Sequence, residues 1–139
     1  MSFAERGIAL LPSGRWNHHQ QVSLELYSLC CEAHLSIGST DSMHSYGDEV
    51  LQQQTLTELE KVRIYHCKIS SLGGGRKSSE ALALSLDVLG KLGCKFPRSS
   101  AGQAVKALAS LRNTKLPKGD IRVLPTMVDE TKKACMVLM

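Results

Sequence analysis

The feature that most constrains this chain is a loose internal repeat. Val50-Leu51 recurs 38 positions later as Val88-Leu89, and Met43 recurs at the same offset as Ala81. A period of about 34 to 47 residues with two helices per unit is typical of α-solenoids, where each helix pair buries its apolar face on a neighbour. The repeat therefore predicts an all-α fold, an α-solenoid of antiparallel, tetratricopeptide-like helix pairs with about six to seven helices.

Composition favours the same fold class. The chain has 139 residues, of which 42% are hydrophobic and only 4% aromatic. Small and aliphatic residues dominate, and these suit close helix packing better than a β-sandwich, which is rich in β-branched and aromatic residues. Glu5 and Arg6 interrupt the apolar N-terminus, and the sequence has no run of about 18 apolar residues. We therefore expect a soluble, cytoplasmic protein without a membrane span.

Apolar spacing and capping residues define the expected helices and two regions. Helices are predicted over residues 2–11, 16–37, 42–54, 55–72 (starting at Thr55 or Thr57), 78–92, 99–113 (starting at Ser99 or Ser100) and 129–139. Residues 1–93 are expected to form tetratricopeptide-like helix pairs, with Gly73-Gly74-Gly75 as a flexible joint between helices. Residues 94–139 are expected to be a basic helical extension. Its apolar end, Cys135 to Met139, lacks a polar cap, so the chain is expected to be a piece of something longer.

Several residues are predicted to build the repeat rather than a reactive site. Gly38 and Gly93 are expected to end helices, Ala33 and Ala81 to lie where helices approach closely, and Trp16 to seal the first helix against the first pair. Along the second helix, Val22, Leu26, Leu29 and Ala33 mark one side, widened by Leu24, Tyr27 and Cys31. Burial is predicted for Leu26, Leu59, Val62, Leu82, Val88 and Leu89. The complete predicted structural set is Trp16, Tyr27, Ala33, Gly38, Val50, Leu51, Ala81, Leu82, Val88, Leu89, Gly93 and Pro97.

The segment 91–122 is strongly basic. Its cations are Lys91, Lys95, Arg98, Lys106, Arg112, Lys115, Lys118 and Arg122, with Asp120 as its one acidic residue. Such a segment suits phosphate backbones or acidic partners. Only Phe96 is aromatic there, so base stacking has little support, and a solvated helix face is the simpler interpretation. Binding of nucleic acid or an acidic partner therefore stays as the alternative function.

No motif predicts catalysis, a cofactor or a metal. Gly73-Gly74-Gly75-Arg76-Lys77-Ser78 resembles the end of a phosphate-binding loop, but Arg76 stands where that loop requires glycine. His18-His19 are adjacent, and adjacent residues on a helix point about 100° apart. The five cysteines are odd in number and have no C-x-x-C spacing, so we expect buried, reduced thiols. The carboxylates are scattered over helix faces, so the chain is not expected to be an enzyme.

Several short sequence motifs, taken in their order along the chain, resemble one protein family. The matching phrases are Gly7-Ile8-Ala9-Leu10-Leu11-Pro12, Trp16 with His18, Leu24-Glu25-Leu26-Tyr27, Glu32-Ala33, Gly38, Val50-Leu51, Lys61-Val62, Glu80-Ala81-Leu82, the run from Val88 to Pro97, Leu124-Pro125-Thr126-Met127-Val128-Asp129 and Lys132-Lys133-Ala134-Cys135-Met136. Together they are similar to the tetratricopeptide-like region of large signalling ATPases, which join an AAA-type ATPase to serine/threonine kinase-like and histidine kinase modules. His18-His19 and the glycine run at 73–75 depart from the family's pattern.

The resemblance implies a mechanical function. The motifs for catalysis in that family lie in other domains, so this region is expected to be a non-catalytic scaffold or relay in signal transduction. Its implied partners are proteins, or the neighbouring ATPase and kinase domains. Nucleic acid is a less favoured partner, no membrane contact is expected, and the apolar C-terminus suggests a second copy of the chain as a further partner.

Overall fold

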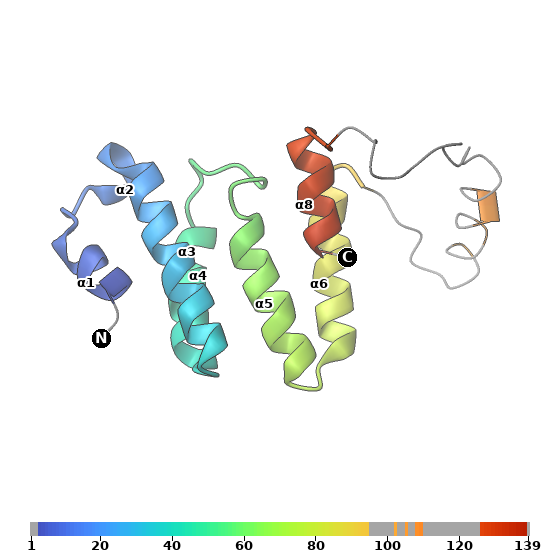
Figure 1. The fold of residues 1–139 in the computed structure, drawn as a ribbon, viewed down its shortest axis with the longest axis horizontal. Helices are drawn as coiled ribbons and strands as arrows, with labels where there is room; N and C mark the ends of the chain where they lie inside the picture. The colour runs from blue at the N-terminus through green and yellow to red at the C-terminus, as the bar shows by residue number, and fades with distance from the viewer. Residues whose placement is uncertain (1–2, 95–101, 103–104, 106–107, 110–125, 139) are drawn as a thin grey trace.

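The structure, a computed structural model, describes residues 3–94, 102, 105, 108–109 and 126–138. These residues form seven assigned α-helices and no strand, so the predicted all-α class is confirmed for the described part of the chain. The helices are α1 (Phe3–Leu10), α2 (Arg15–His18), α3 (Gln20–Ser36), α4 (Thr40–Leu51), α5 (Val62–Gly74), α6 (Ser78–Lys91) and α8 (Glu130–Leu138). In Figure 1, α3, α5 and α8 stand side by side, each with its own contacts to the next.

Two helix pairs carry the internal repeat. Helices α3 and α4 pack together as the first pair, and α5 and α6 as the second (Figure 1). The first helices of the two pairs end at Ser36 and Gly74, and the second helices begin at Thr40 and Ser78. Both boundaries are therefore displaced by the same 38 positions as the sequence repeat.

The turn inside each pair is built by one residue with a positive φ. Gly38 has φ +76° and follows the last turn of α3, where Ser39 N donates to His34 O at 2.9 Å. Arg76 has φ +61° at the equivalent place after α5, with Lys77 N donating to Leu72 O at 3.0 Å. This arrangement satisfies carbonyl groups left free at a helix C-terminus. The second turn thus places an arginine where glycine is the usual residue.

The glycine run lies differently from the sequence prediction. Gly73 and Gly74 are part of α5, and Gly75 caps its end, so these glycines do not form a separate joint. Gly93 does end α6 as predicted: its φ is +88°, and the next residue, Cys94, donates its N–H to Leu89 O at 2.8 Å.

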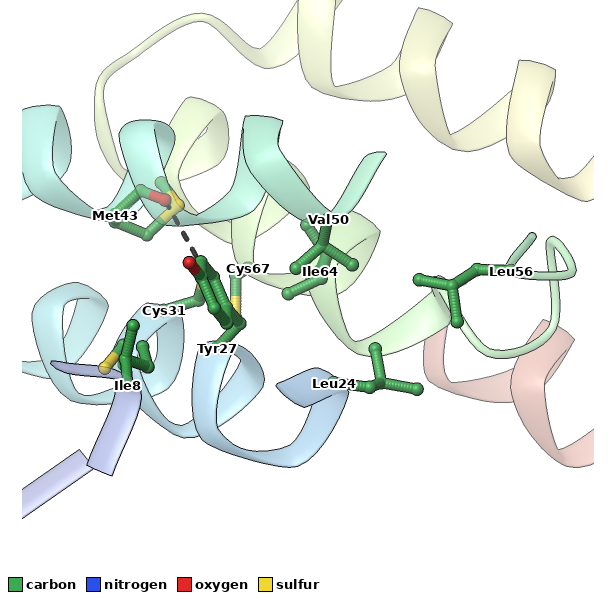
Figure 2. Packing of buried hydrophobic residues seen from close by; sticks show 10 residues of the cluster. Ile8, Leu24, Tyr27, Cys31, Met43, Val50, Leu56, Ile64 and Cys67 are labelled. Atoms are coloured by element: carbon green, nitrogen blue, oxygen red, sulfur yellow. Dashed lines mark hydrogen bonds between the residues drawn. The ribbon is translucent and has the colours of Figure 1, made fainter. Parts of the chain in front are cut away.

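The first core cluster joins four helices, α1, α3, α4 and α5 (Figure 2). Tyr27 of α3, Met43 and Val50 of α4 and Ile64 of α5 are almost completely buried. Its remaining buried members are Ile8, Leu24, Cys30, Cys31, Leu56 and Cys67. Because Ile64 and Cys67 come from the second pair, the two pairs share this core and support one another.

The second core cluster joins α5, α6 and α8. It contains Val62 and Tyr65, Val88 and Leu89, and three residues of the last helix, Ala134, Cys135 and Leu138. Helix α8 contacts both helices of the second pair, as α5 contacts both helices of the first. The apolar end of the chain was predicted to be exposed. It is instead divided, since Ala134, Cys135 and Leu138 are buried while Met136 and Val137 are exposed.

Two helix boundaries differ from the predictions. The helix predicted over 16–37 is broken at His19, which has φ −132°, and the Ser23 hydroxyl donates to Arg15 O at 3.2 Å across the break.

The helix predicted from Thr55 or Thr57 becomes regular only at Val62. Thr57 N donates to the Glu60 carboxylate at 2.8 Å, and Glu60 N donates back to the Thr57 hydroxyl at 3.3 Å. This capping box organises a turn ahead of the helix.

Some burial predictions are wrong for geometric reasons. Leu82 is 58% exposed, because α6 turns Ala81, Ser85 and Val88 toward the core. Leu59 is exposed because it lies in the turns before α5. Ala33 is exposed as well, so it is not a point of close helix approach. The predictions of burial for Val62, Val88 and Leu89 are confirmed.

Most of the basic extension lies outside the described residues. Of the helix predicted over 99–113, only residues 102, 105, 108 and 109 are described. Pro97 and the cations Lys95, Arg98, Lys106, Arg112, Lys115, Lys118 and Arg122 also lie outside them, which leaves Lys91 as the described member of that set.

Candidate functional site: the open face of α3

An apolar strip runs along the outer face of α3. Val22, Leu29 and Ala33 follow one another at spacings of seven and four residues, so they share one side of the helix. All three are exposed, with Val22 at 53% and Leu29 at 47%. The sequence predicted one apolar side made of this stripe and of the neighbouring residues Leu24, Tyr27 and Cys31. In the structure, Leu24, Tyr27 and Cys31 are buried, whereas the stripe itself is exposed.

The second pair shows what such a face packs against. Leu26 and Leu29 of α3 stand 38 positions before Ile64 and Cys67 of α5. Ile64 is 0% exposed and Cys67 1%, because both are covered by the preceding pair, α3 and α4. Leu26 and Leu29 of α3 are thus apolar residues whose equivalents in α5 are covered by a helix pair.

Helix α1 covers part of this face. A methyl group added at Gly7 would lie 3.0 Å from Leu26 Cδ2, so the α1 backbone lies directly against Leu26. Leu26 is consequently half-buried, and it packs against the first core cluster. Leu29, one turn further along α3, remains open. The short α1 therefore leaves the strip of Val22, Leu29 and Ala33 uncovered.

An ionic cluster borders the strip on the side of α5. Arg63 Nε and Nη2 donate to the two Glu32 oxygens at 3.0 and 3.1 Å, and Arg63 Nη1 donates to Glu25 Oε2 at 2.7 Å. These hydrogen bonds, that to Glu32 first, raise the pKa of Arg63, so the guanidinium stays charged. The cluster fixes the spacing of α3 and α5 and gives the strip a polar margin.

A second polar group lies inside the first pair and serves packing. Glu49 of α4 accepts hydrogen bonds from Trp16 Nε1 at 3.3 Å and from the Tyr27 hydroxyl, and Arg15 Nη2 lies 3.4 Å away. The Trp16 and Tyr27 rings are 5.2 Å apart. Burial, and then Glu49, raise the pKa of Tyr27 above its ordinary range. Trp16 thus joins α2 to the first pair, consistent with its predicted sealing position.

A histidine and a carboxylate hold α1 on the first pair. His34 Nε2 lies 3.1 Å from Glu5 Oε1, and the His34 ring stacks on Tyr46 with centroids 5.5 Å apart. Both side chains are mostly buried, and among the described residues the buried His34 Nδ1 has no hydrogen-bond partner. These contacts connect α1, α3 and α4, which is a structural arrangement, and they leave the open strip on another part of α3.

Lys91, the described member of the basic set, is engaged within the second pair. Its Nζ lies 3.1 Å from Asp87 Oδ2 and 5.8 Å from the centre of the Tyr65 ring. The hydrogen bond to Asp87 is the largest cause of a raised pKa at Lys91. Its charge is therefore partly neutralised by its own helix.

The structure also shows where the histidine pair and the glycine run lie, the two motifs considered for metal and phosphate binding. His18 and His19 are exposed at the junction of α2 and α3, and the glycine run is the end of α5. Among the described residues, no three His, Cys, Asp or Glu side chains are grouped so as to hold a metal ion. In the same part of the chain, no helix combines the length and apolar character that a bilayer crossing needs.

Comparisons with known proteins provide no relative. No protein-family model matches the chain, and neither the curated proteins nor the solved structures contain a significant match to it.

Sequence reasoning missed the ionic contacts of Arg63 and the hydrogen bond of the Tyr65 hydroxyl. Both were reachable through the repeat, because Arg63 stands 38 positions after Glu25, its ionic partner, and Tyr65 stands 38 positions after Tyr27. The solvent exposure of Leu29 could not be predicted from the repeat, because it depends on how much of α3 the short α1 covers.

Proposed function

We propose that this chain is a non-catalytic, cytoplasmic helical-repeat module that binds a protein partner in a signal-transduction system of the ATPase and kinase type. The observation that carries the proposal is the open strip of Val22, Leu29 and Ala33 on α3. Exposed apolar strips on ordered helices favour protein association, since burying them removes apolar surface from water. The signalling context rests on the family resemblance alone.

The occupant that suits the strip is an amphipathic helix of another protein or of a neighbouring domain. The supporting comparison is internal, since Cys67, the repeat equivalent of Leu29, is buried against helices. An incoming helix would lie beside α1, present apolar residues to Leu29 and place basic residues near Glu25, which is half-exposed.

Site-specific photo-crosslinking tests this proposal. A photoreactive amino acid replaces Leu29 in the full chain, and a matched control carries it at Leu82, which is similarly exposed on α6. We expect protein adducts at position 29, lost when Val22→Asp is added and absent at position 82. Circular dichroism checks that each variant keeps its helix content. Equal labelling at both positions would contradict the proposal.

The alternative function, binding through the basic 91–122 segment, gives a different result. A phosphate-binding segment releases counterions on binding, so its affinity falls steeply with salt, whereas a strip that binds by apolar contact changes little. Nucleic-acid binding that survives Val22→Asp but disappears between 50 and 200 mM salt would favour the alternative. Lys91, already paired with Asp87, offers it no additional support.

A second copy of this chain is one protein partner that the proposal includes. Met136 and Val137 are exposed on α8, so a second copy is a candidate partner for that surface. Light scattering over a concentration series tests it, and a constant monomer mass would remove the second copy as a partner.

A further inference from the structure

Two cysteines far apart in the sequence meet at one end of the second pair. Cys94 immediately follows Gly93, which ends α6, and Cys135 lies on α8. Their sulfur atoms are 3.1 Å apart, although the residues are separated by 41 positions. Cys94 is partly exposed and Cys135 is buried.

The backbone holds each sulfur in place. Gly93 adopts φ +88°, and Cys94 N donates to Leu89 O at 2.8 Å, so the position of Cys94 is set by the end of α6. Cys135 is fixed by its neighbours Ala134 and Leu138, which are buried in the second core cluster. The contact between the sulfurs therefore follows from the docking of α8 on α6.

We propose that Cys94 and Cys135 form a redox-sensitive pair that closes to an intramolecular disulfide and fastens α8 to the end of α6. A disulfide has an S–S distance of about 2.05 Å, so closure needs a movement of about 1 Å, within reach of side-chain adjustment. The other three cysteines, Cys30, Cys31 and Cys67, are buried in the first core cluster and take no part.

The oxidant is a small-molecule disulfide such as oxidised glutathione. The Cys94 thiolate attacks one sulfur of this disulfide, which forms a mixed disulfide and releases one glutathione thiolate. Cys135 then loses its proton to solvent and attacks the Cys94 sulfur, releasing the second glutathione thiolate. Two protein thiols are oxidised, one glutathione disulfide is reduced to two thiols, and the two protons lost by the cysteines are taken up by glutathione or solvent.

Burial sets the order of these steps. Cys94 is the partly exposed sulfur, so it is the one that an external disulfide reaches first. Burial, and then the hydrogen bond to Cys94, raise the pKa of Cys135 to about 11. The Cys135 thiolate is consequently scarce near neutral pH, and ring closure accelerates as the pH rises toward 11.

Closure changes how firmly the last helix is held. In the reduced protein, α8 is attached by apolar packing on α5 and α6. A disulfide across 41 positions removes conformational freedom from the unfolded chain, which raises the thermal midpoint by about 10 °C for a protein of this size. The pair thus couples the redox state to the attachment of α8.

The test uses the full chain treated with oxidised glutathione at pH 8. After quenching and alkylation, non-reducing peptide mapping should find a Cys94–Cys135 peptide that is two hydrogen atoms lighter than the reduced pair. Cys30, Cys31 and Cys67 should remain reduced, and the oxidised form should melt at higher temperature. Dithiothreitol should reverse both changes.

Single variants complete the design. Cys135→Ser should stop the reaction at a lasting glutathione adduct on Cys94, while Cys94→Ser should yield neither adduct nor disulfide. If Cys135→Ser fails to fold, Cys94→Ser and the wild-type peptide map still decide the question. A wild-type protein that keeps glutathione on Cys94 without closing, or that joins Cys94 to a second chain, would overturn the proposal.

Discussion

Tyr65 lies 38 positions after Tyr27, at the same place in the second helix pair, yet the two hydroxyl groups donate to carboxylates of different segments. The Tyr27 hydroxyl donates to Glu49 of α4, within its own pair. The Tyr65 hydroxyl donates to Glu58 at 3.0 Å, in the turns that lead into α5. One tyrosine therefore joins two packed helices, while its equivalent ties a connecting segment to the core.

Replacing Tyr27 by Phe removes the hydrogen bond to Glu49. We expect the free energy of unfolding to fall by about 1.5 to 3 kcal/mol near neutral pH, the range for a hydrogen bond to a charged group. Urea denaturation measures the loss. Tyr65→Phe is the matched control, and it should change stability less, because its partner Glu58 lies outside the helix pairs. Equal losses would contradict this distinction.

The same variant tests pH dependence. Burial first, and Glu49 next, raise the pKa of Tyr27, and Arg15 opposes them. A raised pKa favours the protonated hydroxyl in the folded state, so this stabilisation is complete below about pH 10 and is lost as the pH rises above it. Stability measured from pH 9 to 11 should fall less steeply in Tyr27→Phe than in the wild type. An unchanged slope would contradict the assignment.

The turn after α5 offers a stabilising change. Arg76 has φ +61°, a conformation that glycine adopts without steric penalty. We expect Arg76→Gly to raise the free energy of unfolding by about 1 kcal/mol. Gly38→Ala is the converse control, because Gly38 has φ +76° and open space around its Cβ position, so it should lower stability by about 1 kcal/mol through backbone strain alone. Thermal melts compare the two variants.

The buried face of α6 is tested at two neighbouring alanines. Ala81 is 8% exposed and faces the core, whereas Ala83 is exposed. Ala81→Leu should overpack the interface and reduce stability by about 1 to 3 kcal/mol, while Ala83→Leu should change it by less than about 0.5 kcal/mol. An unchanged thermal midpoint in Ala81→Leu would show that the helix is rotated from the position described.

A charge exchange tests the ionic cluster. Arg63→Glu places three carboxylates together and should reduce stability by about 1 kcal/mol at low salt. Adding Glu25→Arg restores an opposite-charge pair and should recover part of the loss, and the recovery should shrink in 1 M NaCl. Urea denaturation of the four proteins of this double-mutant cycle gives the coupling. A coupling that does not depend on salt would point to packing rather than charge.

The periodic part of the fold was accessible from sequence. The offset between Val50 and Val88 located two equivalent buried positions, and both side chains are 0% exposed. Gly38 and Gly93 were correctly expected to end helices because a positive φ strongly favours glycine. The second turn escaped this reasoning, since Arg76 occupies the positive-φ position and three glycines precede it.

Helix rotation was the harder quantity. Along α3, apolar residues surround more than half of the helix, so the spacing alone does not decide whether Leu24 or Leu29 faces the core. The answer depends on where α4 and α1 dock, and those contacts join residues far apart in the chain. The open strip and the meeting of Cys94 with Cys135 are results of the same long-range packing.

The ionic partners Glu25 and Arg63 are themselves repeat equivalents, 38 positions apart. A tandem of two identical copies of either pair would set glutamate against glutamate, or arginine against arginine, at this junction. The two pairs are therefore not interchangeable modules. Because the equivalent positions carry opposite charges, the first pair can form this ionic contact with the second pair but not with another copy of itself. The charges at the junction therefore favour one order of the two pairs along the chain.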